Sequence, residues 1–275
     1  MEKDNRNGIE KVIIDAHLHL ANREYMSAAA REAGHENTPE HLGKALREQG
    51  VSGVVAMGGD DGFGLAAEGI RVFCCAPVRG ERLEQDPAAE LERAEKALAE
   101  PACVGLKIYL GYDYRYPSDR VYLPFYELAG SCGKPVVFHT GDTAGDRGKV
   151  KYAHPLGVDE VAVDFRNTRF VLAHCGNPWI VDAVEVAAKN PNAALDLSGL
   201  AVGKFDPDEL YRRCEGYWKL LGTWIDYLSD DSKIIYGSDW PLVNIPAYLK
   251  LMRRVVPERA HDAFFAANAR RLFRL

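Results

Sequence analysis

Short apolar runs recur along the chain, and the segments between them carry polar residues at helical spacing. The runs lie at residues 12–17, 51–57, 71–76, 103–109, 135–139, 169–174, 193–197 and 233–237. Runs that are apolar at nearly every position are typical of parallel strands covered by helices, because both faces of such strands are buried. The pattern therefore predicts eight buried strands, with Pro77 ending the third.

The segments between the runs predict helices. Thr38, Pro39 and Glu40 supply an N-cap, a first-turn proline and a first-turn acid, so a helix is expected from there to about Gly50. Further helices are expected at residues 87–100, 122–132, 158–165, 178–189 and 207–229, with two more, 247–256 and 258–273, forming the tail. Residues 21–37 are expected to be a loop.

Eight strands that alternate with helices predict an α/β fold, namely a single (β/α)8 TIM barrel with a helical C-terminal tail. No linker or low-complexity segment divides the chain. We therefore expect residues 1–275 to form one domain, with residues 1–11 as a polar leader.

Composition removes several classes of function. The net charge of -6 and the pI of about 5.8 argue against a nucleic-acid-binding protein. A membrane protein is not expected, since no apolar stretch approaches the ~20 residues of a membrane span. The charged N-terminus lacks a signal-peptide core, and the six cysteines show no Cys-x-x-Cys spacing, so a reduced, cytoplasmic protein is expected. A homo-oligomer stays open.

Side chains that can bind metals stand at the ends of four predicted strands. His17 and His19 close the first, His139 the fifth and His174 the sixth, while Asp239 follows the eighth. Residues i and i+2 of a strand share one face, so His17 and His19 are expected to project together. Strand C-termini build the active site of such barrels, which predicts that all five side chains converge. The alternative for any single histidine is a structural role in the core.

Together with these histidines, several short motifs resemble the amidohydrolase superfamily. The motifs are His17-x-His19, Gly105-Leu106-Lys107-Ile108-Tyr109, His139-Thr140-Gly141, Ala173-His174-Cys175-Gly176, Leu195-Asp196-Leu197-Ser198-Gly199, Gly237-Ser238-Asp239-Trp240-Pro241 and Asn268-Ala269-Arg270-Arg271-Leu272-Phe273. More narrowly, the chain resembles the amidohydrolase 2 branch, the TIM-barrel metal-dependent hydrolases, over about residues 12–273.

The resemblance implies a metal site and a set of catalytic residues. His17, His19, His139 and Asp239 would bind the metal, with an open position for water. His174 would hydrogen-bond that water or the substrate, and Asp239 would accept its proton, although a helix cap is the alternative for Asp239. Zinc is expected and manganese is the alternative. One ion is favoured; two would require a carboxylated Lys107.

The resemblance implies Lys107 as a substrate contact, and Tyr109, Arg147 and Trp240 are expected as further contacts. The loops after the fourth and fifth strands add aromatic and basic side chains suited to an anionic small molecule, namely Tyr112, Tyr114, Arg115, Lys149 and Lys151. His154 is left open as a contact, Cys175 is a less favoured nucleophile, and His35, His41 and His261 are expected at the surface.

The leading hypothesis is a metal-dependent hydrolase that opens an amide, lactone or ester bond of a small, carboxylate-bearing molecule. The same branch contains non-oxidative decarboxylases of aromatic or unsaturated acids, which is the alternative. A barrel retained as a non-catalytic binding protein is the third interpretation.

Overall fold

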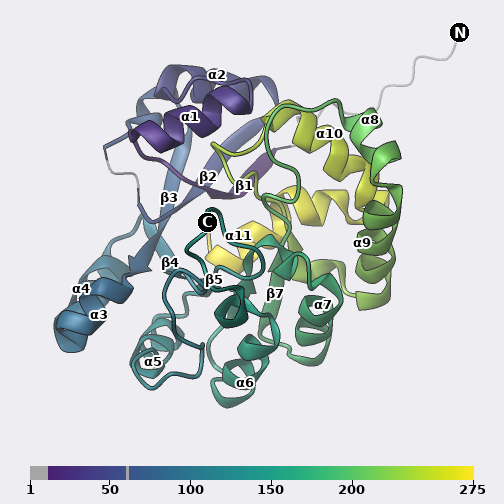
Figure 1. Ribbon diagram of the computed structural model, residues 1–275. Helices are drawn as coiled ribbons and strands as arrows, with labels where there is room; N and C mark the ends of the chain where they lie inside the picture. The colour runs from purple at the N-terminus through teal and green to yellow at the C-terminus, as the bar shows by residue number, and fades with distance from the viewer. Residues whose placement is uncertain (1–11, 60–61) are drawn as a thin grey trace, which may run out of the picture.

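Eight parallel strands form one sheet that curves into a barrel (Figure 1). The structure, a computed structural model, describes residues 12–59 and 62–275, so the predicted leader at residues 1–11 lies outside the described residues. The strands are β1 (Ile13–Leu18), β2 (Val51–Met57), β3 (Arg71–Val78), β4 (Cys103–Ile108), β5 (Val136–Phe138), β6 (Phe170–Leu172), β7 (Ala193–Asp196) and β8 (Ile234–Ile235).

Each strand pairs with the next, and backbone hydrogen bonds join β8 back to β1. Ala16 N donates to Tyr236 O at 2.9 Å, and His19 N donates to Trp240 O at 2.8 Å. The predicted (β/α)8 barrel with a helical tail is confirmed.

Helices cover the outside of the barrel between successive strands (Figure 1). They are α1 (Glu24–Glu32), α2 (Pro39–Glu48), α3 (Gly80–Gln85), α4 (Pro87–Ala99), α5 (Leu123–Ser131), α6 (Leu156–Asp164), α7 (Ile180–Lys189), α8 (Pro207–Arg213), α9 (Glu215–Leu228), α10 (Ile245–Val255) and α11 (Asn268–Phe273). Thr38 caps α2 as predicted, since its hydroxyl accepts from His41 N at 3.2 Å.

Three expectations about these elements are wrong. Residues 21–37 are not a plain loop, because their alanine-rich centre has high helix propensity and forms α1. Pro77 does not end β3, which continues to Val78. Proline lacks a backbone N–H, but none is needed at position 77, because the pairing of β3 with β2 ends at Cys75. The helix expected at 207–229 is divided at Cys214 into α8 and α9.

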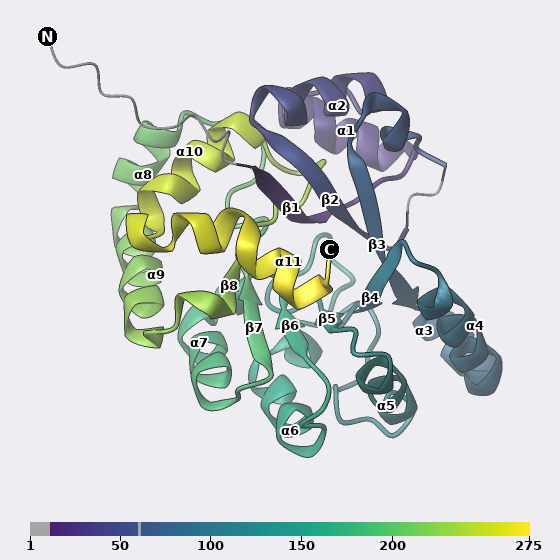
Figure 2. The ribbon, with the colours of Figure 1, turned by 180° about the vertical axis from the view of Figure 1, so that it is seen from behind.

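The tail closes one end of the barrel. Ala269, Leu272 and Phe273 of α11 pack with inward-facing apolar side chains of the strands, and α11 crosses the barrel in the view from behind (Figure 2). The side-chain amide of Asn268 donates to Asp231 O and Ile234 O, where β8 begins. Because α11 occupies the N-terminal ends of the strands, the open end is the one at which the strands finish.

Candidate metal centre

An irregularity in β1 places the first two histidines. Asp15 pairs with Val54 but Leu18 pairs with Ala56, so β1 holds one more residue than β2 over this stretch. Such a bulge lets two consecutive side chains face the same side. Ala16 packs in the inner apolar cluster, and His17 directly after it is also fully buried inside the barrel.

Gly237 makes room for His17. A Cβ atom built on this glycine would lie 2.5 Å from His17 Cβ, closer than two carbon atoms approach. Any larger residue at the end of β8 would therefore displace the histidine.

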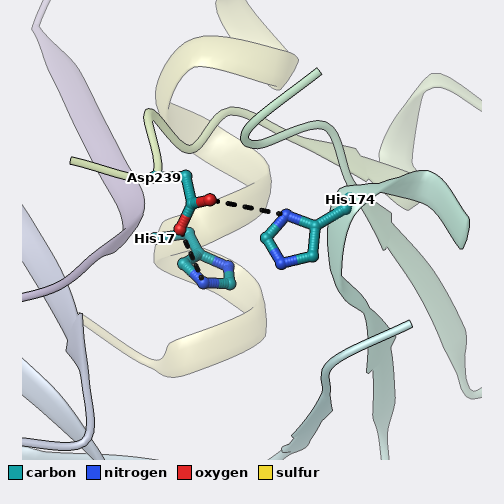
Figure 3. Close-up of side chains that lie close together, drawn as sticks. All are labelled: His17, His174 and Asp239. Atoms are coloured by element: carbon teal, nitrogen blue, oxygen red, sulfur yellow. Dashed lines mark ion pairs between the residues drawn. The ribbon is translucent and has the colours of Figure 1, made fainter. Parts of the chain in front are cut away.

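His17, His174 and Asp239 form the tightest cluster of potential ligands in the described part of the chain, with one ligand atom of each within 4.8 Å of the others. Figure 3 shows the Asp239 carboxylate between the two imidazoles. Its Oδ1 lies 3.6 Å from His17 Nε2 and 3.2 Å from His19 Nε2, and its Oδ2 lies 4.0 Å from His174 Nδ1. The cluster thus joins the ends of β1, β6 and β8.

Two members of the cluster have unusual backbone conformations. His174 has φ of 59° and Asp239 has φ of 68°, a left-handed region that non-glycine residues seldom adopt. Such conformations are concentrated at functional sites, where the surrounding structure maintains them against their cost. Here they turn both side chains into the open end of the barrel.

Hydrogen bonds orient three of the imidazoles. Asp196, fully buried at the end of β7, accepts from His17 Nδ1. His19 Nδ1 donates to Met57 O at 3.1 Å. Because a carboxylate and a carbonyl can only accept, both rings carry their proton on Nδ1 and present the Nε2 lone pair to Asp239.

His174 is held in the same way. Its Nδ1 lies 3.1 Å from the backbone oxygen of Ser198 and 3.1 Å from the Ser198 hydroxyl. Donation from Nδ1 to the carbonyl leaves Nε2 as an acceptor.

A metal ion fits the atoms that this arrangement leaves unsatisfied. His17 Nε2 and Asp239 Oδ1 are buried and have no hydrogen-bond partner within residues 12–59 and 62–275. Both are acceptors and they face each other, so no hydrogen bond between them is available while His17 Nδ1 holds the proton. A cation would satisfy both, and imidazole nitrogen with carboxylate oxygen is a donor set that zinc and manganese accept.

The protonation states also suit a metal. Burial lowers the pKa of His17 and of His139 well below the usual value, and lowers that of His174 to about 4, so all three rings are neutral near pH 7. Burial acts to raise the pKa of Asp239, but the neighbouring imidazoles of His174, His19 and His17 outweigh it and hold this pKa below the usual range. Neutral imidazoles and an ionised carboxylate are the forms that bind metals.

His139 lies beside this cluster. Its ring centroid is 4.9 Å from that of His174, and its Nε2 donates to Asp142 O at 2.8 Å, which leaves Nδ1 as its free nitrogen. The structure thus brings together all five predicted residues at one end of the barrel. The predicted roles, with His17, His19, His139 and Asp239 as ligands and His174 as the water-binding residue, stay a prediction. The close grouping of His174 with His17 and Asp239 would also suit a ligand role for His174.

A cavity of about 680 Å³ opens above these side chains. His19, His139, His174 and Asp239 line its inner end, together with Lys107 and Tyr109. Lys107 does not extend to solvent: it is fully buried, its Nζ lies 5.2 Å from the Tyr109 ring centre, and that Nζ has no hydrogen-bond partner in the described chain. Burial lowers the pKa of Lys107 to about 8, although Asp196 and Asp239 oppose the shift.

Two predicted substrate contacts do not reach the cavity. Arg147 is exposed on the loop after β5, where its backbone oxygen accepts from Tyr114 Oη at 2.6 Å. Trp240 is fully buried behind the site, with its ring centre 5.0 Å from that of His35. The structure places the Arg147 side chain in solvent and the Trp240 side chain in the core, and their role as substrate contacts stays a prediction.

The remaining loop residues divide in the same way. Tyr112 lines the cavity with its ring centre 4.9 Å from that of His139, whereas Lys149 covers the Tyr114 ring at 3.9 Å outside it. Arg115 pairs with Glu84 at 3.0 Å, and His154 lies 4.0 Å from Asp182. His35, expected at the surface, is instead 8% exposed.

Sequence reasoning missed three contributors to the site. Asp196, which orients His17, belongs to the motif Leu195-Asp196-Leu197-Ser198-Gly199, but the sequence assigned it no role in the site. Arg79, directly after β3, lines the cavity, as does Met26 of α1. The helix α1 was not expected, so its contribution to the wall could not be foreseen.

The family model of the amidohydrolase 2 branch, described as amidohydrolase, matches residues 14–275. The chain belongs to this family. No protein with a curated description matches the amidohydrolase sequence. None of its helices in the described part of the chain has both the length and the apolar character needed to cross a bilayer.

Solved structures share the fold of this amidohydrolase at low sequence identity. A probable 2-pyrone-4,6-dicarboxylic acid hydrolase from Acinetobacter baumannii with citric acid bound is 17% identical, with 96% of this chain and 99% of that chain covered and a TM-score of 0.63. An amidohydrolase from Burkholderia multivorans with bound zinc is 17% identical over 96% and 99% of the two chains, with a TM-score of 0.61.

A decarboxylase has the same fold. The 5-carboxyvanillate decarboxylase from Novosphingobium aromaticivorans, complexed with manganese and 4-hydroxy-3-methoxy-5-nitrobenzoic acid, is 13% identical over 100% of both chains, with a TM-score of 0.66. Family membership therefore points to a metal-dependent enzyme, either a hydrolase or a decarboxylase.

Proposed function

We propose that the protein is a metal-dependent hydrolase that opens an amide, lactone or ester bond of a small anionic molecule. The observation that carries this proposal is the pair of buried, unpartnered acceptors, His17 Nε2 and Asp239 Oδ1, which face each other 3.6 Å apart below a 680 Å³ cavity. A site with this composition and an open side suits a catalytic metal.

His17, His19, His139 and Asp239 would hold the metal, with His174 beside them. When bound, zinc or manganese would polarise the substrate carbonyl and make a coordinated water more acidic. The zinc and manganese bound in two proteins of the same fold support these two metals as candidates. One ion is proposed, because an unmodified Lys107 is a cation that would repel a second.

Asp239 and His174 would control the attacking water. Asp239 is ionised and reaches into the cavity, so it can accept a proton from the water and deliver it to the leaving group. His174, with Nδ1 held by Ser198, can accept a hydrogen bond through Nε2 and thereby orient the same water.

Lys107 and Arg79, two of the three basic residues that line the cavity, support an anionic substrate. Lys107 Nζ has no hydrogen-bond partner among the residues that the structure describes, and Arg79, whose backbone N–H donates to Glu90, also lines the cavity. A substrate carboxylate would satisfy either side chain, while the Tyr109 and Tyr112 rings would contact an unsaturated or aromatic body. Citric acid and a nitrobenzoate, bound in two proteins of this fold, are small carboxylates.

Decarboxylation of an aromatic or unsaturated acid is the second candidate. The buried ammonium of Lys107 favours this reaction, because it lines the same cavity as the metal centre. A substrate carboxylate bound to Lys107 would place the carbon that loses carbon dioxide close to the metal. A panel of lactones, esters, amides and aryl carboxylates, assayed for acid production and for carbon dioxide release, separates the two reactions. A non-catalytic binding protein would give neither product.

Metal removal tests the proposal as a whole. Chelation should abolish the activity found in the panel, and zinc or manganese should restore it, while circular dichroism shows that the fold is retained. Full activity after verified loss of metal would contradict a metal-dependent mechanism.

A further inference from the structure

Two cysteines face each other across neighbouring strands, away from the metal centre. Cys74 of β3 is the register partner of Cys103, the first residue of β4. A hydrogen bond of 2.9 Å from Cys74 N to Ala102 O fixes the strands at this point. Neighbouring strands lie about 4.8 Å apart, and disulfides join Cα atoms about 4.4–6.8 Å apart, so the backbone is already within reach.

The two side chains are also close enough to interact. As register partners on neighbouring strands, Cys74 and Cys103 carry their side chains on the same face of the sheet, and each thiol alters the pKa of the other. We propose that Cys74 and Cys103 are a modification site that forms a reversible intramolecular disulfide when the protein meets a peroxide.

Nearby groups make Cys103 the reactive partner. The neighbouring Cys74 thiol outweighs burial and lowers the pKa of the Cys103 thiol to about 6, although Cys103 Sγ donates to Gly105 O at 3.5 Å. The Lys134 ammonium adds to this effect, and it donates to Cys103 O at 2.5 Å. The thiolate is the nucleophile in such oxidations, so Cys103 is expected to react first.

The reaction balances with peroxide as the oxidant. The Cys103 thiolate attacks one peroxide oxygen, which becomes a sulfenic acid while the other oxygen leaves as water after taking a proton. The Cys74 sulfur then displaces the sulfenic oxygen, which leaves as a second water with the Cys74 proton. Two thiols and one hydrogen peroxide thus give one disulfide and two waters.

Access and geometry restrict the reaction to this pair. Cys103 is 3% exposed and Cys74 is partly exposed, so only a small oxidant reaches the sulfurs. Cys75 belongs to the inner apolar cluster, whereas Cys103 and Cys74 pack in the outer one, so Cys75 lies on the opposite face of β3. Cys132 is an exposed thiol that provides an internal comparison.

Peptide mapping tests the proposal. The full-length protein is treated with hydrogen peroxide, the remaining thiols are alkylated under denaturing conditions, and the digest is analysed by mass spectrometry. We expect a peptide pair joined through Cys74 and Cys103, two hydrogens lighter than the sum of its parts, which dithiothreitol separates.

The variants Cys74→Ser and Cys103→Ser should each abolish this pair, whereas Cys132→Ser should leave it unchanged. If either variant fails to fold, the map of the unaltered protein still decides the question. Recovery of Cys74 and Cys103 as alkylated thiols, over-oxidation of Cys103 without a cross-link, or a disulfide to Cys75 overturns the proposal.

Discussion

The ends of β1, β5, β6 and β8 and the loops after β4 and β5 were both expected to build the site, but they contribute differently. At the strand ends, backbone bonds such as Asp239 N to His17 O, at 2.7 Å, fix each residue before its side chain makes any contact. In the loops, Arg147 and Lys149 are exposed and contact other loop residues.

Residues at the strand ends thus form the candidate metal centre, whereas the residues that would select the substrate come from other parts of the chain. Residues at strand ends have positions dictated by the sheet, so the candidate metal centre follows from the order of the strands. The cations that line the cavity come from other places: Lys107 from within β4, Arg79 from just after β3 and Arg23 from just before α1. A basic residue in the loops after β4 and β5 is thus no guide to which cation meets the substrate.

Asp239→Asn is expected to have the largest effect. The amide cannot accept the water proton and binds metal poorly, so we expect kcat to fall by about 10³-fold or more. Because the amide has nearly the same size, the thermal unfolding midpoint should stay close to that of the unaltered protein. An unchanged kcat would remove Asp239 as the proton carrier. Asp182→Asn, outside the cavity, is the matched control.

Asp196→Asn tests the residue behind the metal centre. Loss of the carboxylate that orients His17 should weaken metal binding by about 10–100-fold, as found for residues that support metal ligands. Burial raises the pKa of Asp196 to about 7, so a neutral amide of similar size should be tolerated by the fold. Competition with a chelating dye measures the affinity; equal metal affinities would show that Asp196 has only a packing role.

Arg79→Met and Arg147→Met compare the two sources of cations directly. Methionine retains the length of the arginine stem but not its charge. Loss of a charge-assisted contact should raise KM for a carboxylate substrate, or the inhibition constant for citrate, about tenfold in Arg79→Met. Arg147→Met should leave both constants unchanged. The reverse result would return substrate binding to the loop after β5.

The features that the sequence predicted are those that follow from the spacing of apolar residues and from the order of the strands. Buried runs and their spacing were sufficient for the barrel, and the location of His17, His139 and His174 at strand ends was sufficient to bring them together. The cap at Thr38 also followed from local chemistry.

Other features depend on contacts that no local pattern encodes. The extra residue in β1 and the left-handed φ of Asp239 arise from packing between strands distant in sequence. The bond from His17 to Asp196 joins residues 179 positions apart, and the exposure of Arg147 depends on the path of a long loop.

His35 extends the comparison to a loop residue that lies in the core. Its Nε2 accepts from Ile245 N at 3.3 Å, so its proton is on Nδ1, which donates to His41 Nε2 at 2.9 Å. Burial, with a smaller contribution from His41, lowers the pKa of His35 to about 4. His35 in the unfolded chain therefore binds a proton near pH 6.5, whereas His35 in the folded chain binds one only near pH 4. The free energy of unfolding consequently falls as the pH is lowered from about 6.5 towards 4.

When the pH is lowered from about 7 to about 5.5, protonation of His35 in the unfolded chain should reduce the free energy of unfolding by about 1 kcal/mol. Urea unfolding of metal-free protein measures the loss, and His35→Gln, which does not titrate, should lack this part of it. Equal pH dependence in the two proteins would mean that His35 is protonated as easily in the fold as in water. That result would contradict the burial of His35 against Trp240. It would also contradict the explanation that a loop histidine stays neutral because it packs in the core.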